Sequence, residues 1–392
     1  MKILLLFTLL LSSSVWALTL EEVISTSLAK NPSLESINAR IEANKQSIKI
    51  ANKFANPELL LTKNTLDSSQ SMSQTVLTLK QKVFYWGKRD ADEDVALENE
   101  KLLEEKLNAA KVSLVQKIKD EAYTIWELKE LYDITEQYIT LTKQNIKLYE
   151  AYTTTNSNQH MGVMKAELSL SDLYIQKSLL SSKITSAYAR LSYLTAFSVK
   201  NLDIALSIGE KPQLKNLQNS LQNNPQLKVQ SQTVQKQNAN VQKVALSNYP
   251  DINLLAGYAY RENFDNYFNV GIGLSLPIYG TEDAKEVKER ALLLSASAQK
   301  SDTQNSVNSS LETYYAQMLV SYDIYHIIQD DALPQVAHMF ELSSASISIG
   351  SDLFKYIDVL FSKLDLEKKS IQAVANYKRA QAHISELQGK LK

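Results

Sequence analysis

Histidine and methionine side chains are the residues of this chain that could bind a soft metal ion. His160, Met161 and Met164 lie close together, and His338 and Met339 lie far downstream. Imidazole and thioether groups are ligands that suit copper or silver. The chain has only four histidines, however, and no two of them form a spaced pair. Ordinary helix packing is the competing interpretation, and the sequence predicts no resident metal and no other cofactor.

Residues for catalysis do not form a recognisable pattern. The sequence contains no Ser/His/Asp arrangement that we can place, no glycine-rich phosphate loop and no HExxH motif. It has no cysteine, which excludes disulfides, thiolate metal sites and a cysteine nucleophile. The formal net charge is −1, so nothing indicates a nucleic-acid surface. We therefore expect a protein that is not an enzyme and has no nucleic-acid partner.

An internal duplication organises the chain. The pair Asn31-Pro32 recurs as Asn224-Pro225, and Pro57 recurs as Pro250 at the same interval. Two long stretches therefore align without a gap. We expect a first structural repeat over 18–197, a linker over 198–222 and a second repeat over 223–392.

A secretion signal precedes both repeats. Lys2 is followed by an apolar run over 3–11 and by Val15-Trp16-Ala17, which is typical of a signal peptide cleaved after Ala17. The run is shorter than the roughly 20 residues of a membrane-spanning helix. No other stretch approaches 18 uninterrupted apolar residues, so we expect no transmembrane helix.

Each repeat contains two predicted strands, at 57–67 and 72–85 in the first copy and at 251–261 and 266–279 in the second. Their apolar residues alternate with small or polar ones, as Phe268 and Val270 do with Asn269 and Gly271. Such a pattern over about 10 residues is typical of a tilted transmembrane β-strand. An ordinary sandwich strand is the alternative.

Long helices are predicted around these strands, over 20–54, 88–152 and 163–197 and over 225–247, 281–342 and 353–391. The segment 88–152 has no proline, no glycine and a narrow apolar seam, which indicates coiled-coil packing. Polar breaks are expected at 153–162 and 343–351. Gly87 and Gly280 mark the two strand-to-helix joints, and Pro334 should kink its helix.

Four strands cannot close a membrane barrel alone. The smallest such barrels use eight strands, and an open sheet edge cannot face lipid because its backbone groups would lack hydrogen-bond partners. Several chains would have to pool their strands in the membrane. The sequence therefore predicts a cyclic homo-oligomer in contact with lipid.

Several short motifs resemble the outer membrane efflux protein (TolC-like) family. They are, in chain order, LTLEE from Leu18, VFYWGKR at the first joint, LPIYG at the second joint, LPQVA from Leu333, then Gly350 and IDVL around Asp358. The resemblance covers essentially the whole mature chain. Lys88 and Arg89 after Gly87 resemble the branch that exports heavy-metal cations (CusC/CzcC-like).

The resemblance implies a mainly helical fold with some strands. Long antiparallel helical hairpins would form a periplasmic α-barrel, and four strands per chain would contribute to a trimeric 12-stranded transmembrane β-barrel. It implies an exit duct in the cell outer membrane that passively conducts drugs or metal cations. The implied partners are an inner-membrane pump and a periplasmic adaptor protein.

Two other functions remain open. A related channel could serve type I protein secretion, and the chain could instead be a soluble periplasmic coiled-coil adaptor. Adaptors usually place one helical hairpin between β-rich flanks. Here there are two hairpins, and each pair of strands precedes its long helices, which favours the duct.

The resemblance also implies a periplasmic aperture, for which we predict Asp358, Asp352 and Lys355. Asp358 matches the acidic position of the family, and three copies would form a ring that favours cations. The interval from Gly350 to Asp358 is about two residues longer than expected, and Phe361 stands where some relatives carry a second acid. The gate would then be partly apolar, or Asp352 would supply its acid. Asp352 has the alternative role of capping the final helix.

Overall fold

The computed structural model describes residues 18–65, 67, 70, 72–152, 157–211, 213–347 and 353–391. The predicted signal peptide, 1–17, lies outside them. The chain divides into two compact units, and each takes segments from both halves of the sequence. The sheet unit comprises 33–110 and 222–308, and the helical unit comprises the remaining described residues.

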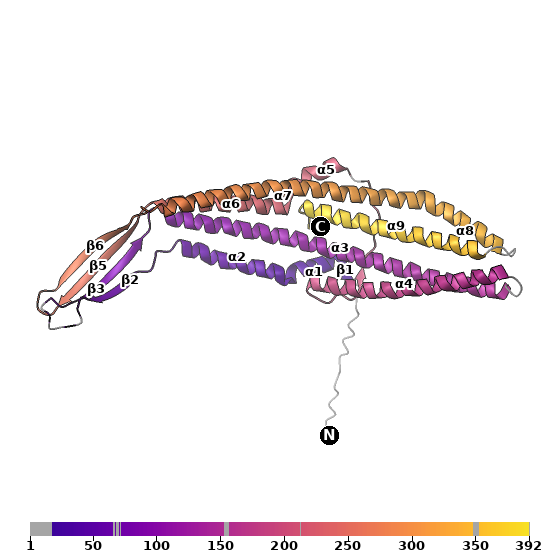
Figure 1. Ribbon diagram of the computed structural model, residues 1–392, viewed down its shortest axis with the longest axis horizontal. Helices are drawn as coiled ribbons and strands as arrows, with labels where there is room; N and C mark the ends of the chain where they lie inside the picture. Colours follow the sequence, from indigo (N-terminus) through magenta and orange to yellow (C-terminus); the bar gives the residue numbers. More distant parts are fainter. Residues whose placement is uncertain are drawn as a thin grey trace, which may run out of the picture. The chain divides into compact units, whose positions relative to one another are not determined.

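The sheet unit contains a four-stranded antiparallel sheet (Figure 1). Its strands are β2 (Glu58–Lys63), β3 (Gln74–Val83), β5 (Asp251–Arg261) and β6 (Tyr267–Ser275), in the order β2-β3-β5-β6. Each repeat thus contributes two neighbouring strands, and β3 pairs with β5 at the centre. All four predicted strands are present, although β2, β3 and β6 are shorter than expected.

Segments of four helices belong to the sheet unit. They belong to α2 (Pro32–Ala51), α3 (Lys88–Tyr152), α6 (Pro225–Ala245) and α7 (Thr281–His326). Asn44 of α2 donates to the Ala96 carbonyl of α3 at 2.8 Å, and Gln237 of α6 donates to Glu289 of α7 at 2.6 Å. Polar side chains therefore form many of the contacts between these helices.

The helical unit has the larger apolar core. It contains α1 (Leu20–Lys30), the rest of α3 and α7, α4 (Ser157–Thr195), a π-helical segment (Ile327–Ala332), α8 (Leu333–Ile347) and α9 (Leu353–Leu387). Ile118, Ile125 and Leu191 are fully buried in one cluster between α1, α3 and α4. Burial of each such side chain contributes about 1.5–3 kcal/mol. None of the described helices has the length and apolar character to cross a membrane.

The predicted helix over 20–54 is two helices, because Asn31 interrupts it. Asn31 has an extended backbone with ψ 122°, as expected for a residue that precedes proline. Pro32 then begins α2, where its missing N–H is not needed. Thr19 begins α1 with a capping box to Glu22.

The predicted break at 153–162 is also too long, because α4 already begins at Ser157. Polar residues there are compatible with a helix once it packs against neighbours. Gly350 and the other residues over 348–352 lie outside the described residues.

The expected linker over 198–222 contains short elements. β4 (Leu202–Asp203) pairs in parallel with β1 (Leu18–Thr19), and α5 (Leu214–Asn219) leads into a 3₁₀ turn (Ser220–Asn223). Tyr377 on α9 donates to the Glu210 carbonyl at 3.0 Å, so this connection is attached to the helical unit.

Candidate functional site

One face of the sheet is apolar and exposed. The register places outward-pointing residues of all four strands side by side, and Leu77 lies opposite Tyr258, which lies opposite Phe268. Val270 and Phe268 are 88% and 82% exposed. The large apolar residues that share this face are Leu59, Leu61, Leu77, Leu79, Val83, Ile252, Leu254, Tyr258, Tyr260, Phe268, Val270, Ile272 and Leu274.

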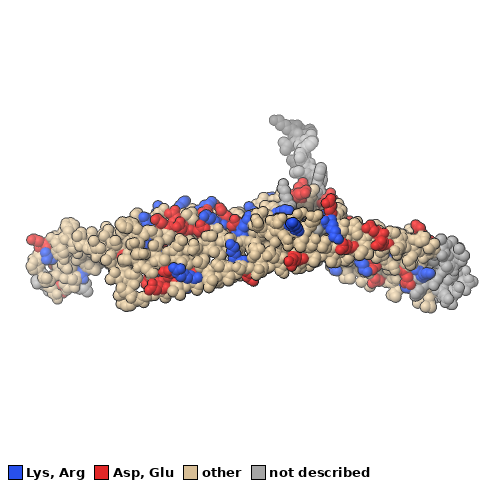
Figure 2. All heavy atoms as spheres, turned by 90° about the horizontal axis from the view of Figure 1, so that it is seen from above, with Lys and Arg blue, Asp and Glu red and all other residues tan. Residues whose placement is uncertain are grey.

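Lys63, at the end of β2, is the one charged residue on this face within the four described strands. Figure 2 shows a stretch over the strands, at its left, that is almost free of charged side chains. A contiguous exposed apolar surface of this kind marks an interaction with a membrane or another protein.

The opposite face of the sheet is more polar, although it also carries Leu60, Val76, Leu255 and Tyr267. It carries the ion pair between Lys80 and Glu58, with 3.1 Å between Nζ and Oε2. Gly257 packs closely against Asn269, so a Cβ there would require the Asn269 side chain to move. The two faces therefore differ as the lipid side and the inner side of a membrane sheet differ.

Both edges of this sheet are open. Among the described strands, β2 pairs only with β3, and β6 pairs only with β5. Unpaired N–H and C=O groups along an edge strand form a template for another strand. The apolar face and the two edges together define a surface that a single chain does not complete.

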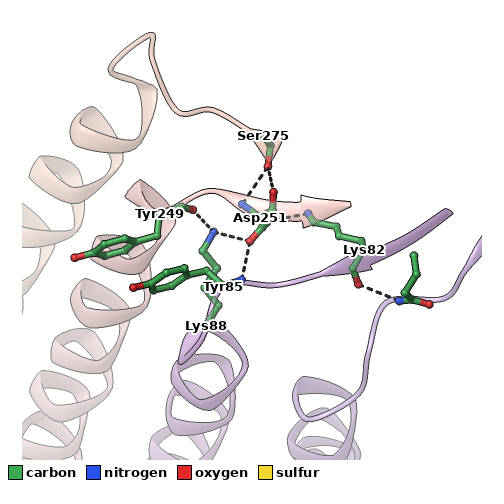
Figure 3. Close-up of polar contacts among 7 residues, drawn as sticks. Lys82, Tyr85, Lys88, Tyr249, Asp251 and Ser275 are labelled. Atoms are coloured by element: carbon green, nitrogen blue, oxygen red, sulfur yellow. Dashed lines mark hydrogen bonds and ion pairs between the residues drawn. The ribbon is translucent and has the colours of Figure 1, made fainter. Parts of the chain in front are cut away.

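A charged cluster holds the sheet to its helices at the strand-to-helix joint (Figure 3). Asp251, at the start of β5, accepts from Lys88 Nζ at 2.8 Å and from the Tyr85 N–H at 3.2 Å, and pairs with Lys82 Nζ at 3.1 Å. Lys88 also donates to the Tyr249 carbonyl at 2.7 Å. Since α3 begins at Lys88, this cluster connects the first repeat to the second.

Further contacts extend this joint. The rings of Tyr85 and Tyr249 stack with centroids 4.4 Å apart. Ser275, at the end of β6, exchanges two 3.3 Å hydrogen bonds with the backbone of Asp251. Arg89 lies 4.2 Å from the ring centroid of Phe54. Lys88 and Arg89 thus act within the chain, as anchors of two different segments.

Gly87 and Gly280 both have left-handed backbones, with φ of +83° and +70°. Each carbonyl accepts the first hydrogen bond of the following helix, from Ala91 to Gly87 and from Ala284 to Gly280. A Cβ would meet only ordinary contacts at Gly87 and nothing at Gly280. The backbone conformation, rather than space, is therefore what requires glycine.

The predicted aperture residues lie in the helical unit. Asp358, on α9, is exposed and pairs with Lys165 of α4, with 2.5 Å between Oδ1 and Nζ. Lys355 is also exposed, and Asp352 lies outside the described residues. Lys165 and Asp358 are 193 residues apart, the same interval that separates Asn31 from Asn224. Equivalent positions of the two repeats thus carry opposite charges and contact one another.

A buried cluster supports the helices that carry this pair. It joins α3, α4 and α9 through Tyr138, Ile146, Leu173, Ile357 and Leu360, among others. Tyr138 donates to Glu367 Oε2 at 2.7 Å. Burial, together with the Glu367 carboxylate, raises the pKa of Tyr138 far above its usual value.

Pro334 lies two residues after the end of the π-helical segment Ile327–Ala332. Proline lacks the N–H that would bond to the preceding turn, and π segments and prolines are both places where helices kink. The side chain of Ile328, within this segment, is buried.

The predicted soft ligands are not gathered into a site by the described side chains. Met161, Met164 and Met339 are at least half exposed, and His338 is exposed. The side chain of His160 lies outside what the structure describes. Among the described residues, no group of three or more His, Asp or Glu side chains could hold a metal ion.

The sequence-based predictions did not name Asp251, Tyr249 or Lys165 as residues of these sites. Asp251 and Tyr249 flank Pro250, which served only as a repeat marker. The repeat interval itself could have indicated Lys165, since it is the partner position of Asp358.

A profile of the family described as outer membrane efflux protein matches residues 23–196 and 216–391. A comparison with curated protein sequences finds no match.

Solved structures share the fold. The MtrE outer membrane channel of Neisseria gonorrhoeae, in its open state, has 13% identity and a TM-score of 0.81, with 95% of this chain and 89% of that chain covered. For CusC the identity is 14%, the TM-score 0.80 and the coverage 95% and 92%. For the outer membrane protein VceC of Vibrio cholerae the values are 14%, 0.79, 95% and 96%. The predicted fold class, that of TolC-like channels, is thereby confirmed.

Proposed function

Because the chain belongs to the outer membrane efflux protein family, we propose that it is the outer-membrane exit duct of a tripartite efflux system. The duct conducts its cargo passively from the periplasm to the exterior and has no catalytic activity of its own. An inner-membrane pump supplies the energy, and a periplasmic adaptor protein joins the pump to the duct. The cargo class is drugs or metal cations.

The observation that carries this proposal is the apolar sheet face bounded by two open edges. Removal of its large apolar side chains from water favours membrane insertion, but the unpaired edges of β2 and β6 would be very costly in lipid. Partner strands must therefore complete the sheet.

Strand direction supports a ring of identical chains. In the antiparallel order β2-β3-β5-β6, the two edge strands run in opposite directions. β6 of one chain can therefore pair antiparallel with β2 of the next, and the ring closes with an even number of strands. Three chains with four strands each would give a 12-stranded barrel, within the known range of outer-membrane barrels.

The proposal also includes the signal peptide, the long helices and the aperture. The signal peptide directs the chain to the periplasm and is removed after Ala17. The long helices of three chains form the periplasmic α-barrel. Asp358 and Lys355 lie at its aperture, where the ion pair with Lys165 partly offsets the acidic ring. Pro334 and the π-helical segment kink the helix that leads toward this aperture.

Membranes separated by density, followed by extraction in detergent and determination of the oligomeric mass, test the proposal. We expect the protein in the outer-membrane fraction as a trimer of mature chains. A soluble monomer, as an adaptor would give, or recovery from the inner membrane would overturn it. Accumulation assays with drugs, metal cations and a secreted protein in cells that lack the chain then separate efflux from type I secretion.

A further inference from the structure

A cavity of about 790 Å³ lies in the sheet unit, where the helices approach the strands. α2, α3 and α6 line it, and these helices are already joined by direct hydrogen bonds, from Asn44 to Ala96 and from Lys236 to Asn99. The cavity is therefore formed within one chain. No role proposed above for the chain uses it.

The charge of the lining is strongly unbalanced. Four cationic side chains and one carboxylate face the cavity, namely Lys53, Arg89, Lys236, Lys243 and Asp92. Asp92 pairs with Lys243 at 2.8 Å, so the single acid is already engaged. Among the described residues, neither Lys53 nor Lys236 forms an ion pair.

The environment of Lys236 gives the strongest argument for a bound anion. Its Nζ donates to the neutral Asn99 amide at 2.8 Å, and the side chain is half-buried. Burial, reinforced by the nearby charge of Lys106, lowers its pKa. A cation that is desolvated beside another cation favours an anion close to it.

The rest of the lining is apolar or amide-bearing. Ile50, Phe54, Phe84 and Val95 supply apolar surface, and Asn44, Asn56 and Asn99 supply hydrogen-bonding groups. Phe84 directly follows β3, so apolar lining reaches the end of the cavity nearest the strands. Ligand sites commonly combine apolar walls with a few polar groups in this way, at volumes of roughly 300–1,000 Å³.

We propose that this cavity binds an amphipathic anion, in which a phosphate or carboxylate group is attached to an apolar body. The anionic group lies among Lys53, Lys236 and Lys243, and the apolar body lies against Phe54 and Phe84. A lipid headgroup and a soluble organic phosphate share this chemistry. The inference goes beyond the proposed function, because a duct does not require a ligand site here.

Thiol labelling tests the electrostatic potential of the cavity. An introduced cysteine is labelled specifically, because the chain has no cysteine of its own. Ser47 lines the cavity, and Ser301 is an exposed serine of the same unit that does not. In detergent-extracted protein, the labelling rate with an anionic methanethiosulfonate is divided by the rate with its trimethylammonium analogue. This ratio should be about tenfold higher for S47C than for S301C. Addition of K236Q or K53Q to S47C should lower this preference. Equal ratios at the two positions would overturn the proposal.

Protection of S47C then tests the ligand. Phenyl phosphate should slow labelling at lower concentration than inorganic phosphate, and benzylammonium should not slow it. In nanodiscs, phosphatidylglycerol should protect S47C more than phosphatidylcholine if the ligand is a lipid. Protection by either phenyl phosphate or phosphatidylglycerol supports the proposal and distinguishes the two sources.

Protection by neither compound would overturn the proposal, as would inorganic phosphate acting as strongly as phenyl phosphate. The oligomeric mass of the same preparation is measured in parallel. A failure of the proposed duct would therefore be recognised separately from a failure of this site.

Discussion

Glycine is needed at both strand-to-helix joints for its backbone conformation, since Gly87 and Gly280 have positive φ and a Cβ would meet no close contact at either position. We expect G280A to lower the stability of the protein by about 1–2 kcal/mol, through backbone strain alone. Asparagine adopts this conformation more readily than alanine, and valine less readily. Thermal unfolding in detergent should therefore rank G280N above G280A and G280A above G280V. Equal midpoints for the three variants would contradict this account.

Asp251 should contribute more to stability than Glu58, the exposed carboxylate at the equivalent position of the first repeat. Its side chain is 13% exposed and pairs with Lys82 and Lys88, whereas Glu58 is 65% exposed and pairs only with Lys80. We expect D251N to lower stability by about 1–3 kcal/mol, because two lysines lose their partner near the protein interior. E58Q is the matched control and should cost less than about 1 kcal/mol. Similar unfolding midpoints for the two variants would show that the joint does not depend on Asp251.

Tyr138 gives the stability of the helical unit a dependence on alkaline pH. Its pKa is raised in the folded protein by burial and by Glu367. Between the unfolded pKa near 10 and the higher folded pKa, the native state holds a proton that the unfolded chain releases. The contribution is therefore fully present below about pH 10 and is lost as the pH rises further.

We expect Y138F to lose about 1 kcal/mol at neutral pH, since the hydrogen bond to Glu367 is removed. The variant should also lose less stability than the parent chain between about pH 9 and pH 11. Thermal midpoints across this range provide the measurement. Parallel pH profiles for the parent and Y138F would rule out the role assigned to Tyr138.

At the scale of elements, the two faces of the sheet should meet different solvents. A single bimane-labelled cysteine at Val270 should be quenched by brominated lipids in vesicles, because its side chain lies on the apolar face. The label at Asn269, one residue away on the other face, should respond instead to aqueous iodide. Iodide quenching of both positions would remove the membrane role of the sheet.

Some elements were predictable because their cause is local. The alternation in β5 and β6 and the uninterrupted run of α3 predicted those elements, and α3 begins and ends where the sequence indicated. The break at Asn31 was also readable, since proline restricts the residue before it. It was missed because Asn31-Pro32 was used only to detect the repeat.

Other elements depend on tertiary contacts that no local pattern shows. Residues from Ser157 onward are helical in spite of their polar composition, because α4 packs against α3 and α9. The pairing of β1 with β4 brings together two-residue segments from distant parts of the chain. The contact between Lys88 and Asp251 was also not predictable from a local pattern, because it depends on the first joint lying beside Asp251 in the folded chain.

At the scale of the whole molecule, the duplication determines which strands of the sheet one chain supplies and which edges it leaves unpaired. Each repeat supplies two strands to one sheet, and the strands at its two edges come from different repeats. The joints at Gly87 and Gly280 recur at the repeat interval with the same backbone conformation. The recurrence of the two joints is visible in the sequence, whereas the proposed partner of each open edge belongs to another chain.

The central claim is that β6 of one chain pairs with β2 of the next in a closed ring of three. Cysteine pairs that combine Val270 or Ile272 with Leu59 or Leu61 test it, on a background that has no other thiol. L79C/A256C is the control, since these positions face each other across β3 and β5 within one chain. After oxidation in the membrane, at least one β6–β2 pair should give covalent dimers and trimers and nothing larger, while the control stays at the mass of one chain. Absence of cross-links for every pair, or a ladder that continues beyond three chains, would contradict the account.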